Sequence, residues 1–239
     1  MRIAMWSGPR NLSTALMYAF GNRNDTIISD EPYYGAYLYH SGVKHPMNQI
    51  IIDSQPKDPD IISSRLTGTV PEPYRVWYQK LLTHQMLPSF SLDWIAQQQN
   101  VFLIRSPAKV IASYDIKRQN PSLDDLGFVQ QKKIFDHCLL LGQKPIVIDS
   151  EDILANPETS LSGLCEALGI DFDVAMLSWI AGSRAEDGVW ASHWYDAVHK
   201  STGFAEPSKS IPNLGTEFFD ILTTANKLYE QFKAIKLKT

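Results

Sequence analysis

The chain has 239 residues, of which 44% are hydrophobic and 20% charged, enough to bury a full core in one large domain over residues 1–239. Its formal net charge of −4 argues against a general binder of nucleic acid or anionic membranes. No apolar run approaches the roughly 18 residues of a membrane span, and a strand predicted to start at Arg2 leaves no room for a signal peptide. We therefore expect a cytoplasmic protein, with Cys138 and Cys165 as buried thiols.

The predicted elements alternate between strand and helix. Short, continuous apolar runs, typical of strands buried on both faces, occupy residues 3–6, 26–29, 101–104 and 145–148. Helical apolar spacing covers residues 14–20, 75–82, 108–119, 128–141 and 160–168. Because strands that alternate with helices build right-handed βαβ units, we expect an α/β fold with a mainly parallel sheet flanked by helices.

The turn between the first strand and the first helix gathers groups that bind anions. It reads Ser7-Gly8-Pro9-Arg10-Asn11-Leu12-Ser13-Thr14, with one glycine, one cation and two adjacent hydroxyls. Free backbone N–H groups at the start of a helix favour an anion. The phosphate-loop pattern GxxxxGK[ST] is met only in part, because the second glycine and the lysine are missing. A simple turn followed by a helix cap explains this stretch about equally well when it is taken alone.

The same arrangement recurs in "VFLIRSPAKVIASYDIKR", residues 101–118. The strand runs into Arg105, Pro107 suits the first helical turn, and Ser113 follows Arg105 by eight residues. Arg105 could make a forked contact with a phosphate whose oxygens Ser113 also reaches. A lone arginine at a strand end is usually a surface residue, but two strand–turn–helix units that each carry a cation favour two phosphate sites.

These segments resemble the sulfotransferase family. "GPRNLST" is similar to its 5′-phosphosulfate loop, usually PKSGTT, and "RSPAKVIAS" is similar to its 3′-phosphate signature of an arginine followed eight residues later by a serine. "IVIDSEDILANPETSLSGLCEALGI" resembles the strand and helix further along the same fold. The resemblance runs in one consistent order over about residues 2–180.

The resemblance implies a fold like that of P-loop nucleoside-triphosphate hydrolases and an enzyme that uses 3′-phosphoadenosine 5′-phosphosulfate (PAPS). A sulfuryl group would pass to a hydroxyl or amine of a small acceptor without a bound metal, leaving 3′-phosphoadenosine 5′-phosphate (PAP). The donor-binding residues implied are Pro9, Arg10, Asn11, Leu12, Ser13, Thr14, Arg105 and Ser113, with Arg10 and Arg105 at opposite ends of the nucleotide. Arg10 replaces the usual lysine, and Asn11-Leu12 replaces Ser-Gly.

Transfer needs a base, because the acceptor loses a proton as it attacks sulfur. Lys80 and His84 lie at i and i+4 of a predicted helix, and Thr83-His84 match the end of the "KTH" segment of cytosolic sulfotransferases. Glu31 resembles the base of the carbohydrate and tyrosylprotein branches. A structural histidine and a loop carboxylate are the simpler alternatives. We expect His84 to be the base, Glu31 to orient the acceptor or act as the base itself, and Lys80 and Arg10 to assist.

A distal segment, "GVWASHWYDAVHKSTGFAEPSK", could close over the donor. Ser201, Thr202 and Gly203 would supply donors to the 3′-phosphate, although the letters differ from the family's usual closing loop. Trp190, Trp194 and Tyr195, with Tyr33, Tyr34 and Tyr37, could line an acceptor pocket. An aromatic helix that only packs on the core is the plainer interpretation of this segment.

Two other classes of protein compete with a sulfotransferase. A P-loop kinase would use ATP and Mg²⁺, and Asp149 at the end of "IVIDS" is the one residue that could serve as its metal carboxylate. A non-catalytic nucleotide-binding relative would keep the fold and lose the transfer reaction.

Overall fold

The computed structural model describes residues 1–208 and 210–238. Within these residues a five-stranded sheet has the order β2-β3-β1-β4-β5, and every neighbouring pair is parallel. The strands are β1 (Arg2–Ser7), β2 (Thr26–Asp30), β3 (Val76–Leu82), β4 (Gln99–Ile104) and β5 (Ile146–Asp149). The predicted α/β fold with a parallel sheet is confirmed.

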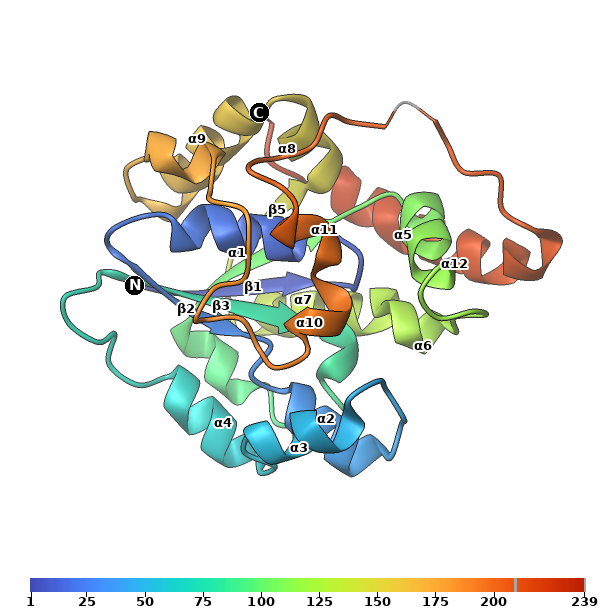
Figure 1. Cartoon of the computed structure of the whole chain (residues 1–239), viewed down its shortest axis with the longest axis horizontal. Helices are drawn as coiled ribbons and strands as arrows, with labels where there is room; N and C mark the ends of the chain where they lie inside the picture. The colour runs from blue at the N-terminus through green and yellow to red at the C-terminus, as the bar shows by residue number, and fades with distance from the viewer. Residues whose placement is uncertain (209, 239) are drawn as a thin grey trace.

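Helices connect the strands and cover both faces of the sheet. They are α1 (Ser13–Gly21), α2 (Tyr34–Ser41), α3 (Asn48–Ser54), α4 (Pro59–Leu66), α5 (Pro107–Asp115), α6 (Leu123–Leu126), α7 (Phe128–Leu140), α8 (Ser150–Ala155), α9 (Pro157–Leu168), α10 (Ala191–Trp194), α11 (Asp196–His199) and α12 (Phe219–Lys233). Four 3₁₀ turns in the described chain are η1 (Thr83–Gln85), η2 (Asp93–Gln97), η3 (Val174–Leu177) and η4 (Thr216–Phe218). In Figure 1, α1 and α9 lie on one side of the sheet and α4 on the other.

Alternate residues of each strand enter two different cores. Ile3 and Met5 of β1 belong to the core beneath α1 and α9, whereas Ala4 and Trp6 belong to the core that α7 and α12 cover. All four side chains are fully buried. Because both faces of the strand are covered, β1 reads as a continuous apolar run without a polar alternation.

One predicted element is wrong. Residues 75–82 were expected to be helical, but Val76–Leu82 form β3, which lies between β2 and β1 in the sheet. Burial on both faces removes the period-two alternation that would have distinguished a strand from a helix. Lys80 and His84 therefore do not share a helix face: Lys80 is within β3, and His84 is in the η1 turn that follows it.

No helix among the residues that the structure places is both long enough and apolar enough to cross a membrane.

Gly127 fixes the turn that carries His84. Its φ is +73°, and a Cβ built there would lie 2.5 Å from Thr83 Oγ1 and 3.1 Å from the His84 amide nitrogen. The Thr83 hydroxyl donates a hydrogen bond of 2.9 Å to the Gly127 carbonyl. The absence of a side chain at Gly127 therefore lets the start of α7 pack directly on η1.

We expect Gly127→Ala to destabilise the protein by about 1–3 kcal/mol more than Gly142→Ala, because inserting a methyl group into a filled site strains its neighbours. Gly142 is a matched control, since its φ is +74° and a Cβ there would meet nothing within 4 Å. Urea unfolding of both variants measures the difference. Equal losses would show that only the backbone conformation requires glycine.

Candidate active site

A cavity of about 270 Å³ lies at the carboxyl ends of the central strands. Its walls come from the turn after β1, from Arg105 after β4, and from Ser113 and Tyr114 of α5. The end of β3 and the turn after it contribute Lys80, Leu82, His84 and Gln85. Glu31, Tyr34, His45 and residues between Trp194 and Ala205 also line the cavity. Ligands of open parallel sheets bind at this edge, where the turns that follow the strands converge.

Most of the predicted site residues meet at this cavity. Those that line it are Pro9, Arg10, Asn11, Leu12, Ser13, Thr14, Glu31, Lys80, His84, Arg105, Ser113, Ser201 and Gly203. Thr202 is not among the lining residues, and its carbonyl accepts a hydrogen bond from the Trp179 amide at 3.0 Å. The Ser201 hydroxyl accepts a hydrogen bond from Trp179 Nε1 at 3.1 Å and donates one to the Val198 carbonyl at 2.8 Å.

The turn before α1 has the backbone shape of a glycine loop without the glycines. Arg10 and Leu12 have φ of 59° and 65°, in the region that favours glycine. Leu12 occupies the N-cap position of α1 and supplies no side-chain cap. The amide groups at the start of α1 thus lack the usual side-chain acceptor, and Ser13, Thr14 and Ala15 line the cavity. This arrangement is suited to an anion.

Asn11 holds this turn in place from beneath. Its side chain is buried, with Nδ2 donating to the Leu103 carbonyl at 2.8 Å and Oδ1 accepting from Ser150 Oγ at 2.9 Å. The sequence predicted Asn11 as a donor-binding residue. In the structure its side chain bonds to β4 and α8 and positions the turn, and Asn11 also lines the cavity.

Two arginines lie together at one end of the cavity. Arg10 Nε donates to Ser113 Oγ at 2.9 Å, and Arg105 Nη1 donates to the Arg10 carbonyl at 2.7 Å. Burial, and then the nearby Arg105 charge, lower the pKa of Arg10. Burial also lowers the pKa of Arg105, with partial compensation from Glu151 at 3.7 Å. Two partly buried cations that lie side by side are suited to binding an anion.

The structure brings together Arg10 and Arg105, which the sequence analysis placed at opposite ends of one nucleotide. The positive φ of Arg10 turns its side chain toward α5, where it meets Ser113, the residue predicted to work with Arg105. Both arginines therefore lie at the same end of the cavity.

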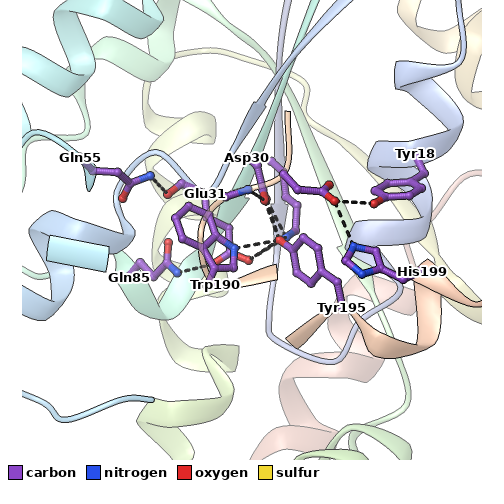
Figure 2. A network of polar contacts seen from close by, with 11 residues as sticks. Tyr18, Asp30, Glu31, Gln55, Gln85, Trp190, Tyr195 and His199 are labelled. Atoms are coloured by element: carbon purple, nitrogen blue, oxygen red, sulfur yellow. Dashed lines mark hydrogen bonds and ion pairs between the residues drawn. The ribbon is translucent and has the colours of Figure 1, made fainter. Parts of the chain in front are cut away.

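Lys80 is the centre of a buried polar cluster with Asp30, Glu31 and Tyr195 (Figure 2). Its side chain is 1% exposed, and its Nζ donates to Asp30 Oδ1 at 2.9 Å, to Glu31 Oε1 at 2.7 Å and to the Tyr195 hydroxyl. Burial lowers the pKa of Lys80, but the two carboxylates more than offset this and raise it. Because all three ammonium hydrogens are used, Lys80 holds the carboxylates and has no hydrogen left for a ligand.

Asp30 ties the segment after η3 to the end of β2. Its two oxygens each lie 2.8 Å from the Tyr195 hydroxyl, and Oδ2 accepts the Gly188 amide at 3.0 Å. Trp190 Nε1 donates to the same tyrosine oxygen at 3.0 Å (Figure 2). Burial raises the pKa of Asp30, the adjacent Glu31 raises it further, and Lys80 opposes both.

Glu31 has no free carboxylate oxygen. Oε1 accepts from Lys80, and Oε2 accepts from Gln85 Nε2 at 2.7 Å. Its φ of 40° turns the chain sharply after β2, and its carbonyl accepts Gln55 Nε2 at 3.0 Å (Figure 2). The carboxylate is thus fixed at the wall of the cavity.

His84 is buried, and no hydrogen bond to another described residue holds its ring. Nδ1 has no hydrogen-bond partner among the residues described, and the ring packs edge-on against Tyr37 with centroids 5.4 Å apart. Burial lowers the pKa of His84 to about 4, with Asp125 acting in the opposite direction. The imidazole is therefore neutral at pH 7 and can accept a proton.

The sequence analysis missed His45. The ring lies between α2 and α3, with Nδ1 2.7 Å from the Tyr34 hydroxyl and Nε2 2.6 Å from Arg118 Nη1. An arginine can only donate, so Nε2 is the acceptor and Nδ1 carries the proton. Burial is the main cause that lowers the pKa of His45 to about 4. No local motif marks this residue, because tertiary contacts alone bring it to the cavity.

All residues of the site lie within the segment that matches a known protein family. The family profile of the sulfotransferase domain matches residues 1–236. The chain therefore belongs to the family of proteins with a sulfotransferase domain, and the predicted resemblance is confirmed.

Two curated relatives come from Arabidopsis thaliana. Branched-chain-amino-acid aminotransferase-like proteins 1 and 2 are 35% and 33% identical to the chain over 228 residues, which is 95% of this chain. The match covers 40% of the length of each relative.

Two solved structures are also similar. The sulfotransferase domain of the Synechococcus PCC 7002 olefin synthase is 16% identical, with a TM-score of 0.47 over 94% of both chains. The sulfotransferase domain of the curacin biosynthetic pathway is 17% identical, with a TM-score of 0.49 over 99% of this chain and 92% of the other.

We expect the buried His84 to make the protein less stable in mild acid. Its pKa is about 4 in the folded state against an ordinary 6.5, so between these values the unfolded chain binds a proton that the folded chain does not. The free energy of unfolding thus falls as pH drops from 6.5 toward 4, by about 2 kcal/mol at pH 5 from this residue.

Urea unfolding of the parent and of His84→Asn at pH 7 and pH 5 measures this contribution. The variant should lose about 2 kcal/mol less than the parent on acidification, because all other titrating groups are common to both proteins. Equal losses in the two proteins would contradict a lowered pKa for His84.

Proposed function

We propose that the chain is a sulfotransferase that moves a sulfuryl group from PAPS to a hydroxyl or amine of a small acceptor. The observation that carries the proposal is one cavity that combines paired arginines, an uncapped helix start and an unengaged neutral histidine. The free, buried thiols of Cys138 and Cys165 support the predicted cytoplasmic location.

The donor fits the anion-binding groups of the cavity. Arg10, Arg105 and Ser113 would hold the 3′-phosphate, because they present fixed donors at one place. The amides and hydroxyls of Ser13 and Thr14 at the start of α1 would hold the 5′-phosphosulfate. When bound, the donor supplies the sulfuryl group.

The neutral imidazole of His84 suits the base. An acceptor oxygen or nitrogen bonds to sulfur, the bond from sulfur to the phosphate oxygen breaks, PAP leaves, and the acceptor's proton passes to His84. The imidazolium that forms is stabilised by the negative charge of Asp125, which favours the protonated ring. A sulfuryl group carries less negative charge than a phosphoryl group, so fixed N–H donors at α1 can balance the transition state.

Glu31 is better suited to positioning than to proton transfer. Both of its oxygens already accept hydrogen bonds, one from Lys80 and one from Gln85. Taking up a proton would require breaking one of these bonds in a buried site, which makes Glu31 the poorer base. We therefore assign proton transfer to His84 and orientation of the acceptor wall to Glu31 and Lys80.

The kinase alternative rested on Asp149, which has a structural role. Its Oδ1 caps α8 by accepting the Glu151 amide at 3.0 Å, and its Oδ2 accepts the Tyr229 hydroxyl at 2.7 Å. Asp149 does not line the cavity. Over residues 1–208 and 210–238, no three His, Cys, Asp or Glu side chains cluster as metal ligands. No contact in this cavity favours ATP with Mg²⁺, which remains one arm of the test below.

Calorimetric titration with PAP and with ATP, each with and without Mg²⁺, tests the donor. We expect metal-independent binding of PAP, and Arg105→Ala should weaken it about 10- to 150-fold, the effect of losing a hydrogen bond to a charged group. Arg65→Ala is the control, since Arg65 is exposed on α4 and lies outside the cavity. Preference for ATP with Mg²⁺ would overturn the proposal.

Initial rates with saturating PAPS test the base. His84→Asn should lower kcat by about 10²–10⁴-fold while PAP affinity changes little, because the ring acts on the acceptor's proton. In the parent, the rate should stay constant from pH 7 downward and fall only near pH 4, where His84 gains a proton before it can act. If PAP binds but no acceptor is sulfated by the parent, the chain is a non-catalytic relative.

A further inference from the structure

The cavity is lined by aromatic rings as well as by the arginine pair, and its end at β2 and β3 lies across β1 from Arg105, which follows β4. The rings that line the cavity are those of Tyr34, His45, His84, Tyr114, Trp194 and Tyr195. Lys80 is the only Lys or Arg in this part of the described lining, because the others are Arg10 and Arg105. Aromatic faces carry a negative quadrupole that attracts cations.

Two buried carboxyl groups and one lysine meet at the same end. Asp30 and Glu31 both pair with Lys80, and the three side chains are 1%, 6% and 1% exposed. The remaining contacts of the carboxylates come from neutral groups, namely Tyr195, Gln85 and the Gly188 amide. Two buried carboxylates thus face one lysine, and in the described chain no second cation pairs with either of them.

The two histidines of this wall add no positive charge to the cluster at neutral pH. Burial keeps His84 and His45 uncharged, since the pKa of each is about 4. Arg118 is already engaged, because it donates to His45 and lies 3.6 Å from Asp125. The donor itself is an anion, so its binding would make the cavity more negative. An unbalanced buried charge is costly unless a partner is supplied.

We propose that the acceptor is an alcohol that carries an ammonium group, with the cation against the aromatic wall beside Glu31 and the hydroxyl at His84. This inference rests on the proposed function and narrows its acceptor. The hydroxyl is the nucleophile because a positively charged ammonium nitrogen has no lone pair with which to attack sulfur.

Three probes of similar size and different charge test the acceptor class. They are choline, its neutral isostere 3,3-dimethylbutan-1-ol, and the anion 3-hydroxy-2,2-dimethylpropanoate. Their dissociation constants are measured by calorimetry on protein saturated with PAP, so that the result does not depend on turnover. We expect choline to bind at least tenfold more tightly than the neutral alcohol, and the anion to bind most weakly.

Glu31→Gln removes the excess negative charge and should reduce the preference for choline over the neutral alcohol about tenfold. Asp187→Asn is the matched control, because the Asp187 side chain is also buried, accepts hydrogen bonds from Tyr18 and His199, and does not line the cavity. Trp194→Leu removes one ring without touching the ion cluster and should also lower the preference, which keeps the test available if Glu31→Gln does not fold.

The outcomes separate this inference from the proposed function. Equal affinities for the three probes, tightest binding of the anion, or equal losses for choline and the neutral alcohol in Glu31→Gln would overturn the ammonium inference alone. Failure of the parent to bind PAP in the first titration would overturn the proposed function, and the acceptor inference with it.

Discussion

A lysine inside the sheet determines how the cavity is built. Lys80 lies in β3 with almost no exposure, and its charge must be balanced where the strand ends. The balance comes from Asp30 and Glu31 at the end of the neighbouring strand, and it fixes the sharp turn into α2. Tyr195 joins the same cluster from far along the chain, so the segment that covers the cavity is attached to its floor.

The anion-binding end depends on a second constraint, the fixed shape of the turn before α1. Leu12 and Arg10 adopt positive φ without being glycine, which costs about 1–2 kcal/mol per residue. Asn11 offsets this cost with buried hydrogen bonds to Leu103 and Ser150. The departures from the usual loop are thus related: the loop has no glycine at its positive-φ positions, and the buried Asn11 side chain holds it in this conformation.

Local patterns predicted the parts of the fold that are local. The two strand–turn–helix units were found because an apolar run, a turn and a helix start lie within about 20 residues of one another. β3 was mistaken for a helix because burial on both faces removes the alternation, and its Gln79 and Lys80 are polar residues inside a sheet. Contacts such as Tyr195 to Asp30 join residues 165 apart and have no local signal.

The site residues likewise divide into those placed by local sequence and those placed by tertiary contacts. Arg105 and Ser113 both line the cavity, as their spacing led us to expect, since one helix and its preceding turn place both. The direction of the Arg10 side chain was not predictable, because it follows from a backbone conformation that is unusual for arginine. His45 is brought to the cavity by packing between α2, α10 and the turn after α5, which only the folded chain defines.

The opposite charges of the two ends give the proposed reaction a direction. A cationic alcohol is drawn to the end that holds Asp30 and Glu31, and more strongly once an anionic donor lies against the arginines. Transfer of the sulfuryl group adds one negative charge to the acceptor and makes it a zwitterion without net charge. The product is therefore attracted less than the substrate by the same fixed carboxylates, and its new sulfate is repelled by the bisphosphate that remains. The charge that favours binding of the acceptor thus also favours release of its sulfate ester.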